Sequence, residues 1–203
     1  MFEDFRADVA RARTENYLKK TWFHQNVWVL LQPNTLVVGA YRLCRWARKL
    51  RNPVLRIPMK MAAFIFRRYM EFVTGCFIAP AAEIGPGFVV HNLYGVIVGG
   101  TKIGKNCTVF SDTKISYAVH SIGDDVSVGL GAVIVENVKI GNNVKIAPNS
   151  LVITDIPDNM MVMGVPARIR LRRPPLQQQA PLPAVSAAVA GAVNGAAQRP
   201  VIR

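Results

Sequence analysis

The feature that most constrains this 203-residue chain is an aliphatic residue that recurs every six positions through its middle. The series runs through Ile78, Ile84 and Val90, then Ile97, Ile103, Val109 and Ile115, then Ile122, Val128, Ile134, Ile140, Ile146 and Val152. All thirteen positions hold Ile or Val, although these residue types fill only 22 of the 75 places from 78 to 152, so chance does not explain the series. The count resumes one position late at Ile97 and again at Ile122.

A second series of mostly small or β-branched residues follows each aliphatic position by four: Ala82, Thr101, Cys107, Thr113, Val119, Val126, Ala132, Val138, Val144 and Ser150. A period of six is neither that of a strand nor that of a helix. Each hexad is therefore interpreted as a short strand and a corner, and three hexads close one triangular coil. We predict a mainly β fold, a parallel β-helix that buries both series, with a short α-helical segment before it. The two late positions indicate bulged coils, and irregular corners on a regular scaffold are where sites are built.

Composition divides the chain into three predicted segments: a basic helical segment at 1–75, the β-helix domain at 76–173, and a tail at 174–203. The first segment holds 14 Lys/Arg against 5 Asp/Glu, so most of the net charge of +13 belongs to it. The tail is rich in Ala, Pro and Gln and lacks large apolar residues, which predicts disorder.

The basic segment contains two candidate helices, at 41–52 and 59–73, each with apolar and basic faces. One interpretation is peripheral attachment to an anionic membrane surface, at the inner face of the membrane of a cytoplasmic protein. The other is a helical cap on the repeat or a contact between copies. Nucleic acid is not expected as a partner, because no nucleic-acid-binding motif accompanies the charge. The three cysteines, Cys44, Cys76 and Cys107, are scattered and fit reduced thiols.

The order of motifs within 76–170 is more specific than the hexads. HNLYGVIVGG stands at the first late position, a loop with His120 at the second, and GVPAR at 164–168 ends the repeat. This order resembles the hexapeptide-repeat acetyltransferases, and among them the serine acetyltransferase branch, which includes relatives that acetylate bacterial polysaccharides. The resemblance implies a left-handed β-helix that forms a homotrimer or a dimer of trimers, with acetyl-CoA in a groove between coils.

The resemblance also implies that a histidine at the first bulge acts as general base on the acceptor hydroxyl, a role that suits imidazole near neutral pH. His91 is the candidate, and His120, in the second bulge, is implied to contact the acceptor or support the base. The family places its histidine three residues before the glycine, a position that Asn92 holds relative to Gly95 here. Asn92 is therefore a third candidate. The carboxylate that orients the base, about fifteen residues upstream in the family, has no counterpart in GCFIAP.

Residues for CoA follow from the same resemblance. Gly129, Leu130 and Gly131, together with Ala147 and Pro148, are expected to line the pantetheine groove through their backbone. Lys145 and Arg168 are expected to meet the CoA phosphates. A metal is not expected, because only His91 and His120 lie in the repeat and His24 lies in the helical segment.

We expect an acetyl-CoA-dependent O-acetyltransferase acting on L-serine or a saccharide hydroxyl. The shifted histidine and the missing carboxylate leave open a β-helix that only binds or scaffolds. Transfer to an amine is a third alternative, although GVIVGG fits the serine branch better. The short second loop favours an acceptor larger than serine.

Overall fold

The computed structural model describes residues 2–15, 29–135 and 137–171. The described helices and coils belong to one compact unit. The predicted tail at 174–203 and His24 lie outside the described residues. Among the described residues, four helices precede the strands: α1 (Phe2–Glu15), α2 (Val29–Leu31), α3 (Pro33–Lys49) and α4 (Pro53–Thr74). None of the described helices is long and apolar enough to pass through a bilayer.

The helices start and stop where local chemistry requires. Pro33 stands at the beginning of α3, where its missing N–H costs nothing. Asn52 caps α4, since its side chain accepts a hydrogen bond from the Val54 N–H at 3.2 Å. Gly75 ends α4 in the left-handed conformation with φ of 65°. Pro58 lies within the first turns of α4, so this helix begins earlier than the predicted 59–73.

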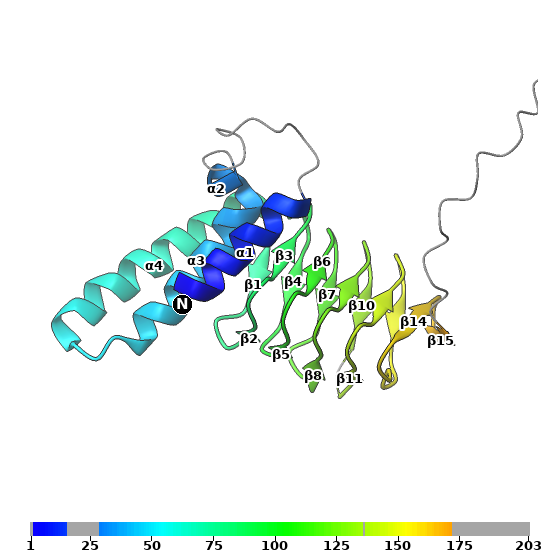
Figure 1. Cartoon of the computed structure of the whole chain (residues 1–203). Helices are drawn as coiled ribbons and strands as arrows, with labels where there is room; N and C mark the ends of the chain where they lie inside the picture. The colour runs from blue at the N-terminus through cyan, green and yellow to red at the C-terminus, as the bar shows by residue number, and fades with distance from the viewer. Residues whose placement is uncertain (1, 16–28, 136, 172–203) are drawn as a thin grey trace, which may run out of the picture. The chain divides into compact units, whose positions relative to one another are not determined.

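The remaining described chain is a stack of two-residue strands, closed by one hairpin (Figure 1). The strands are β1 (Phe77–Ile78), β2 (Glu83–Ile84), β3 (Val89–Val90), β4 (Ile97–Val98), β5 (Lys102–Ile103), β6 (Thr108–Val109), β7 (Lys114–Ile115), β8 (Ser121–Ile122), β9 (Ser127–Val128), β10 (Val133–Ile134), β11 (Lys139–Ile140), β12 (Lys145–Ile146), β13 (Leu151–Val152), β14 (Met160–Met163) and β15 (Arg168–Leu171).

Three parallel sheets form the sides of a prism. Face A contains β1, β4, β7, β10 and β13; face B contains β2, β5, β8 and β11; face C contains β3, β6, β9, β12 and β14, with β15 added antiparallel. Every third strand therefore pairs, and β1 to β12 make four coils of three strands. The predicted parallel β-helix preceded by helices is confirmed. The chain passes from face C to face A through corners 91–96, 110–113, 129–132 and 147–150, which we call the C–A edge. Corners 79–82, 99–101 and 116–120 belong to the A–B edge.

Both predicted series point inward, with one correction. All ten members of the second series are buried, and so are twelve of the thirteen aliphatic positions. The exception is Ile97, which is 38% exposed, while Val98 is fully buried in its place. Corner 91–96 has six residues where later corners of this edge have four, and corner 99–101 has three where 79–82 has four. The sequence shift of one position thus combines an insertion of two residues with a deletion of one.

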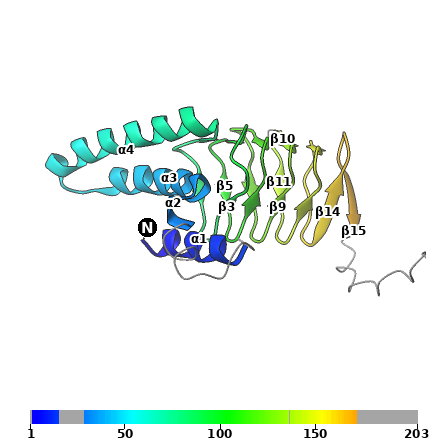
Figure 2. The ribbon, with the colours of Figure 1, turned by 90° about the horizontal axis from the view of Figure 1, so that it is seen from above.

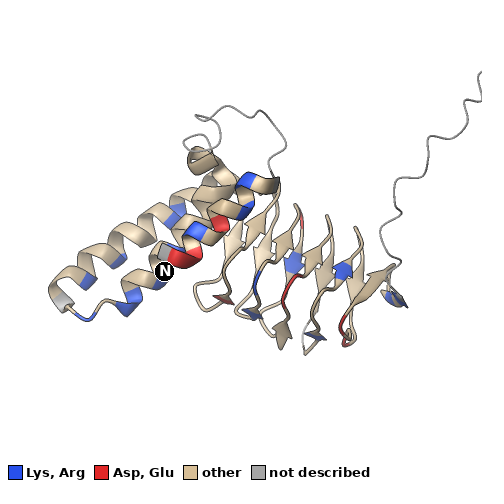
Figure 3. Cartoon of the chain, viewed as in Figure 1, with Lys and Arg blue, Asp and Glu red and all other residues tan. Residues whose placement is uncertain are grey.

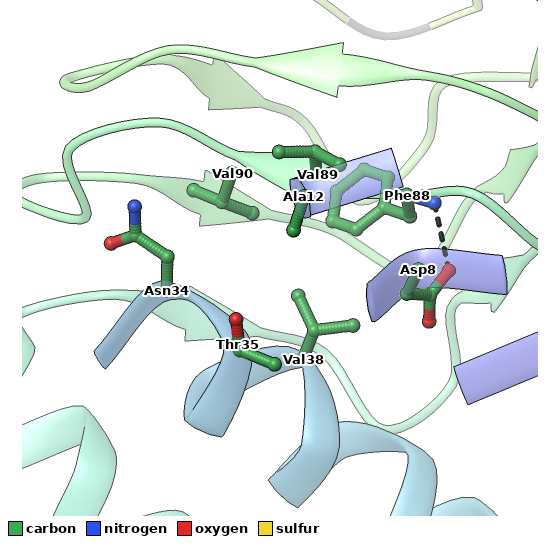
Figure 4. A pocket seen from close by; sticks show the side chains of 8 residues that line it. All are labelled: Asp8, Ala12, Asn34, Thr35, Val38, Phe88, Val89 and Val90. Carbon is green, nitrogen blue, oxygen red and sulfur yellow. Dashed lines mark hydrogen bonds between the residues drawn. The ribbon is translucent and has the colours of Figure 1, made fainter. Parts of the chain in front are cut away.

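The helices are fixed to the first coil by buried polar contacts. Arg42 is 3% exposed and donates to the Asp8 carboxylate at 3.0 Å and to the Ile84 carbonyl at 2.7 Å. Asp8 also accepts from the Phe88 N–H at 2.8 Å (Figure 4). Burial raises the pKa of Asp8, and the Arg42 guanidinium opposes that shift. Figure 2 shows α1, α3 and α4 side by side at the first end of the stack. The helices therefore cap the coils, as one of the two interpretations expected.

Candidate active site

The C–A edge gathers most of the residues that the sequence singled out. His91 and Asn92 begin its first corner, Gly129, Leu130 and Gly131 lie in its third, and Ala147 and Pro148 lie in its fourth. Because neighbouring strands in a sheet are about 4.8 Å apart, two coils separate His91 from Gly129 by roughly 10 Å along the edge. These residues occupy one line parallel to the prism axis.

His91 is held by the coil that follows. Its N–H donates to the Val109 carbonyl at 2.8 Å, which continues the β3–β6 ladder by one residue. Its ring stacks on Phe110, with 5.1 Å between centroids and 23° between planes. The ring is half-buried. The stack fixes the orientation of the imidazole and leaves part of it accessible, as a general base requires.

No carboxylate takes the upstream position that the resemblance implies. Cys76 stands fifteen residues before His91, is buried, and burial raises the pKa of its thiol to about 12. It is therefore neutral at physiological pH and cannot act as the orienting anion. The C–A edge carries one acid that sequence reasoning missed, Asp112, in the second corner. Lys114 lies 3.3 Å from it, and both side chains are more than half exposed.

Asn92 has a conformational reason for its place. Its φ is 51°, in the left-handed region that asparagine tolerates better than most residues. Gly95, Asp112, Gly131 and Asn149 form a stacked column of left-handed residues, one in each corner of the C–A edge. Asn92 is an additional one, found only in the enlarged first corner. Its exposed side chain stands beside His91, and the turn alone explains the residue type.

A groove of about 620 Å³ runs over face A. It is lined by Ile97, Lys114, Ile115, Ser116, Tyr117, Val133, Ile134 and Val135. The first enlarged corner leads directly into Ile97, and the second begins at Ser116. The groove therefore connects the two irregular corners, and its volume lies in the range of small-molecule sites. Tyr117, which sequence reasoning missed, is 57% exposed and packs against Phe77 with 6.2 Å between ring centroids.

His120 lies apart from His91. It is in corner 116–120 of the A–B edge, on the other side of face A, and its side chain is exposed. Its N–H donates to the Val138 carbonyl at 3.1 Å. Within one chain the structure thus places the two histidines at different edges of the prism. In the part of the chain that the structure describes, no three His, Cys, Asp or Glu side chains are grouped as metal ligands.

The corners expected to line the CoA groove are joined to one another by backbone hydrogen bonds. The Leu130 carbonyl accepts from the Asn149 N–H at 2.8 Å, and Gly131 donates to the Ser111 carbonyl at 3.0 Å, so the third corner is locked between its neighbours. A Cβ at Gly129 would lie 2.6 Å from the Pro148 nitrogen, which explains the glycine. Leu130 and Pro148 are exposed. The third and fourth corners are therefore held in place by hydrogen bonds and are also exposed at Leu130 and Pro148.

The two expected phosphate ligands share the outer side of face C. Lys145 is exposed in β12, and its register partner in β14 is Met161, which in turn pairs with Arg170 of β15. Arg168 is exposed two residues before Arg170, opposite Met163. Arg170 therefore joins Lys145 in one row across the sheet. Sequence reasoning missed it because the hairpin follows the last hexad and does not share its period.

Comparison with known proteins gives a family match within the later coils of the β-helix. The family model "Bacterial transferase hexapeptide (six repeats)" matches residues 120–154. Serine acetyltransferase of Bacillus pumilus is 31% identical over 132 residues, which are 61% of this chain and 61% of that protein. The chain thus spans about three fifths of the length of this curated relative.

Solved structures match more of the chain, helices included. Soybean serine acetyltransferase complexed with serine superposes with a TM-score of 0.67 and 27% identity, covering 83% of this chain and 68% of that one. A serine acetyltransferase in complex with CoA shares the fold, with a TM-score of 0.67 and 23% identity, covering 83% of this chain and 69% of that one. Residues 120–154 thus match the hexapeptide-repeat transferase model, and the chain is similar to serine acetyltransferases in sequence and in fold.

Proposed function

We propose that the protein is an acetyl-CoA-dependent O-acetyltransferase that acts on the hydroxyl of L-serine or of a saccharide. The observation that carries the proposal is the similarity to serine acetyltransferases, together with the single edge on which His91 and the expected CoA residues lie. Soybean serine acetyltransferase has been solved with serine bound, and a serine acetyltransferase of the same fold has been solved with CoA bound. Acetyl-CoA enters here as co-substrate.

The proposed reaction needs no acyl-enzyme. The His91 imidazole takes the proton of the acceptor hydroxyl while that oxygen attacks the thioester carbonyl carbon. The C–O bond forms, the C–S bond breaks, and the imidazolium returns the proton to the departing thiolate. Gly129–Gly131 and Ala147–Pro148 would hold pantetheine along the C–A edge, with Lys145 and Arg168 toward the phosphates. Asn92, next to His91, would donate a hydrogen bond to the acceptor.

The position of His120 favours an assembly of copies. Because His91 and His120 lie on different edges of one prism, a site that uses both needs either an acceptor that crosses the face A groove or a second copy. The homotrimer that the resemblance implies would set edges of neighbouring copies side by side. We propose that His120 of one copy meets the acceptor near His91 of the next.

A saccharide is the second candidate acceptor. The groove over face A is open, mostly apolar and, at about 620 Å³, larger in volume than serine requires, and Tyr117 stands at its side with more than half of its surface exposed. An exposed aromatic ring suits an amphipathic ligand, since it offers an apolar face and a polar tip. This observation favours the larger acceptor.

Release of CoA thiol from acetyl-CoA tests the proposal. The intact protein is incubated with L-serine, with a panel of monosaccharides or with neither, and the thiol is measured by its reaction with a disulfide reagent. Release that one acceptor stimulates, and that His91→Ala abolishes while the thermal melt is unchanged, supports the enzyme. If the protein binds acetyl-CoA but no acceptor stimulates thiol release, and His91→Ala does not change the release rate, the result supports the alternative of a β-helix that binds without catalysis.

A further inference from the structure

The helical cap presents an apolar surface that the coils do not use. Nine large apolar side chains of α4 are exposed: Val54, Leu55, Ile57, Met61, Phe64, Ile65, Tyr69, Phe72 and Val73. We call this set the outer stripe of α4. The fractions reach 81% at Val54 and 90% at Phe72, so the stripe contacts nothing else in the described chain over most of its surface.

The stripe has the period of a helix face. Val54, Met61, Ile65 and Phe72 are seven, four and seven residues apart, which places them in one row along the helix. The opposite face, with Ala63, Met70 and Thr74, is buried in the cap. Figure 2 shows α4 on the outside of α3, with its N-terminal end extending away from the coils. An exposed apolar row of this length marks an interaction surface.

Charge identifies the occupant. Residues 33–75 contain nine Lys/Arg and one acidic residue, Glu71. Both carboxylate oxygens of Glu71 are engaged, one by Arg67 and the other by Arg68 at 3.0 Å. Arg56, Lys60 and Arg68 are exposed on α4 itself, and Figure 3 shows Lys and Arg positions spread along the ribbon of the α3–α4 hairpin. A second copy laid on the stripe would bring like charges together, whereas anionic lipid complements them.

A basic hollow adjoins the stripe. It has a volume of about 210 Å³ and is lined by residues of α3, α4 and the first coil, with Arg48, Lys60 and Arg67 around it. Phe64, a member of the outer stripe, forms one side. Apolar side chains and a cationic hollow next to each other match the two parts of a phospholipid, the acyl chain and the phosphate.

We propose that the outer stripe of α4 docks the protein on the surface of an anionic lipid bilayer, with α4 lying in the plane of the interface. Apolar side chains enter the acyl boundary, Arg68 at the edge of the row faces the headgroups, and the other basic side chains of the α3–α4 hairpin add attraction at longer range. This inference does not depend on the proposed acetyl transfer. Of the two interpretations of the basic segment, it selects attachment to a membrane surface. The helices also cap the coils, because one face of α4 is buried in the cap and the opposite face is exposed.

Flotation with vesicles tests the proposal on the intact chain. Vesicles of equal parts phosphatidylglycerol and phosphatidylcholine are expected to carry the protein upward, at least about tenfold more than pure phosphatidylcholine, and raised salt is expected to weaken binding. The double variant Ile65→Ser with Phe72→Ser is expected to lower binding about tenfold or more. Its matched control is Ile153→Ser, which changes an exposed apolar residue of the coils and is expected to bind as the parent does.

A charge pair completes the test. Arg56→Glu with Lys60→Glu is expected to reduce flotation about tenfold or more, and Lys139→Glu, on exposed face B, to leave it unchanged. Thermal melts check that each variant is folded. Failure of the parent to float with anionic vesicles overturns the proposal, and so does flotation that the stripe variant does not alter. A parent that stays unbound, with a stripe variant that dissociates a larger assembly, would assign the stripe to a second copy instead.

Discussion

The two enlarged corners of the β-helix look alike in sequence and differ in structure. Each delays the aliphatic series by one position and carries a histidine. In the first, six residues replace four, two of them left-handed, and His91 stacks on Phe110. In the second, five residues replace four and His120 is exposed. Packing on the next coil, rather than the length of the insertion, therefore decides which imidazole has a fixed orientation.

The largest expected difference between the corners is catalytic. His91→Ala should lower kcat/KM by about 10²–10⁴, because it removes the proposed general base. His120→Ala should lower it by about tenfold or less, since an exposed side chain that only contacts the acceptor contributes about one hydrogen bond. Stimulated CoA release at several acceptor concentrations measures both. A larger loss for His120→Ala would reverse the assignment of the base.

The register of the first corner predicts the next effect, on stability. Val98→Ala should lower the free energy of unfolding by about 2 kcal/mol, because Val98 is fully buried and the change leaves a cavity. Ile97→Ala removes a larger side chain but should cost less than about 1 kcal/mol, because Ile97 is 38% exposed. Urea unfolding of the two variants compares them. If Ile97→Ala were the more damaging, the simple one-residue shift read from the sequence would be right.

Most of the fold could be predicted because each hexad obeys one local rule. The aliphatic position needs Ile or Val, the position four residues later needs a small or β-branched residue, and stacking repeats the rule in every coil. The rule fails at Ile97 and Val98, where three consecutive apolar residues, Val96 to Val98, leave the register undetermined by hydrophobicity alone. The short corner 99–101 offsets one of the two residues inserted in corner 91–96. This offset is a property of the closed coil, and no local sequence pattern predicts it.

The candidate site was predictable only in part. The hexad count places His91, Gly129–Gly131 and Ala147–Pro148 in corners between the same two faces, and the structure aligns them along one edge. It could not give Phe110 as the partner of His91, because that contact joins consecutive coils nineteen residues apart. Arg170 and Tyr117 were also missed, since one lies in a hairpin and the other in an irregular corner.

The Phe110 stack should have an intermediate effect. Phe110→Leu keeps an apolar residue but loses the aromatic pair, which is worth about 1 kcal/mol of stability. If the stack orients the base, kcat should fall several-fold while KM for acetyl-CoA stays near that of the parent. Phe110→Tyr retains the ring and should restore kcat. A loss of stability with unchanged kcat would show that the stack is only structural. The two histidines would then differ only in the edge of the prism on which they lie.

The smallest effect concerns Cys76, which stands where the resemblance expects an anion for the first corner. Burial raises the pKa of this thiol from 9.0 to about 12, so it is neutral in the folded protein at pH 7–8. An acid whose folded pKa is raised retains its full contribution to stability below the unfolded pKa. That contribution is lost as the pH rises from about 9 toward 12, where the unfolded chain releases the proton first.

Below pH 9 the stability should therefore not respond to Cys76. Site-resolved labelling with iodoacetamide at pH 8 should be far slower at Cys76 in the native chain than in urea. Cys44, which is less buried, serves as the internal comparison in the same digest. Native labelling of Cys76 at the denatured rate would mean that a thiolate is available beside the first coil. The first corner would then possess the anion that its sequence lacks, and the difference between His91 and His120 would have an electrostatic cause as well as a packing one.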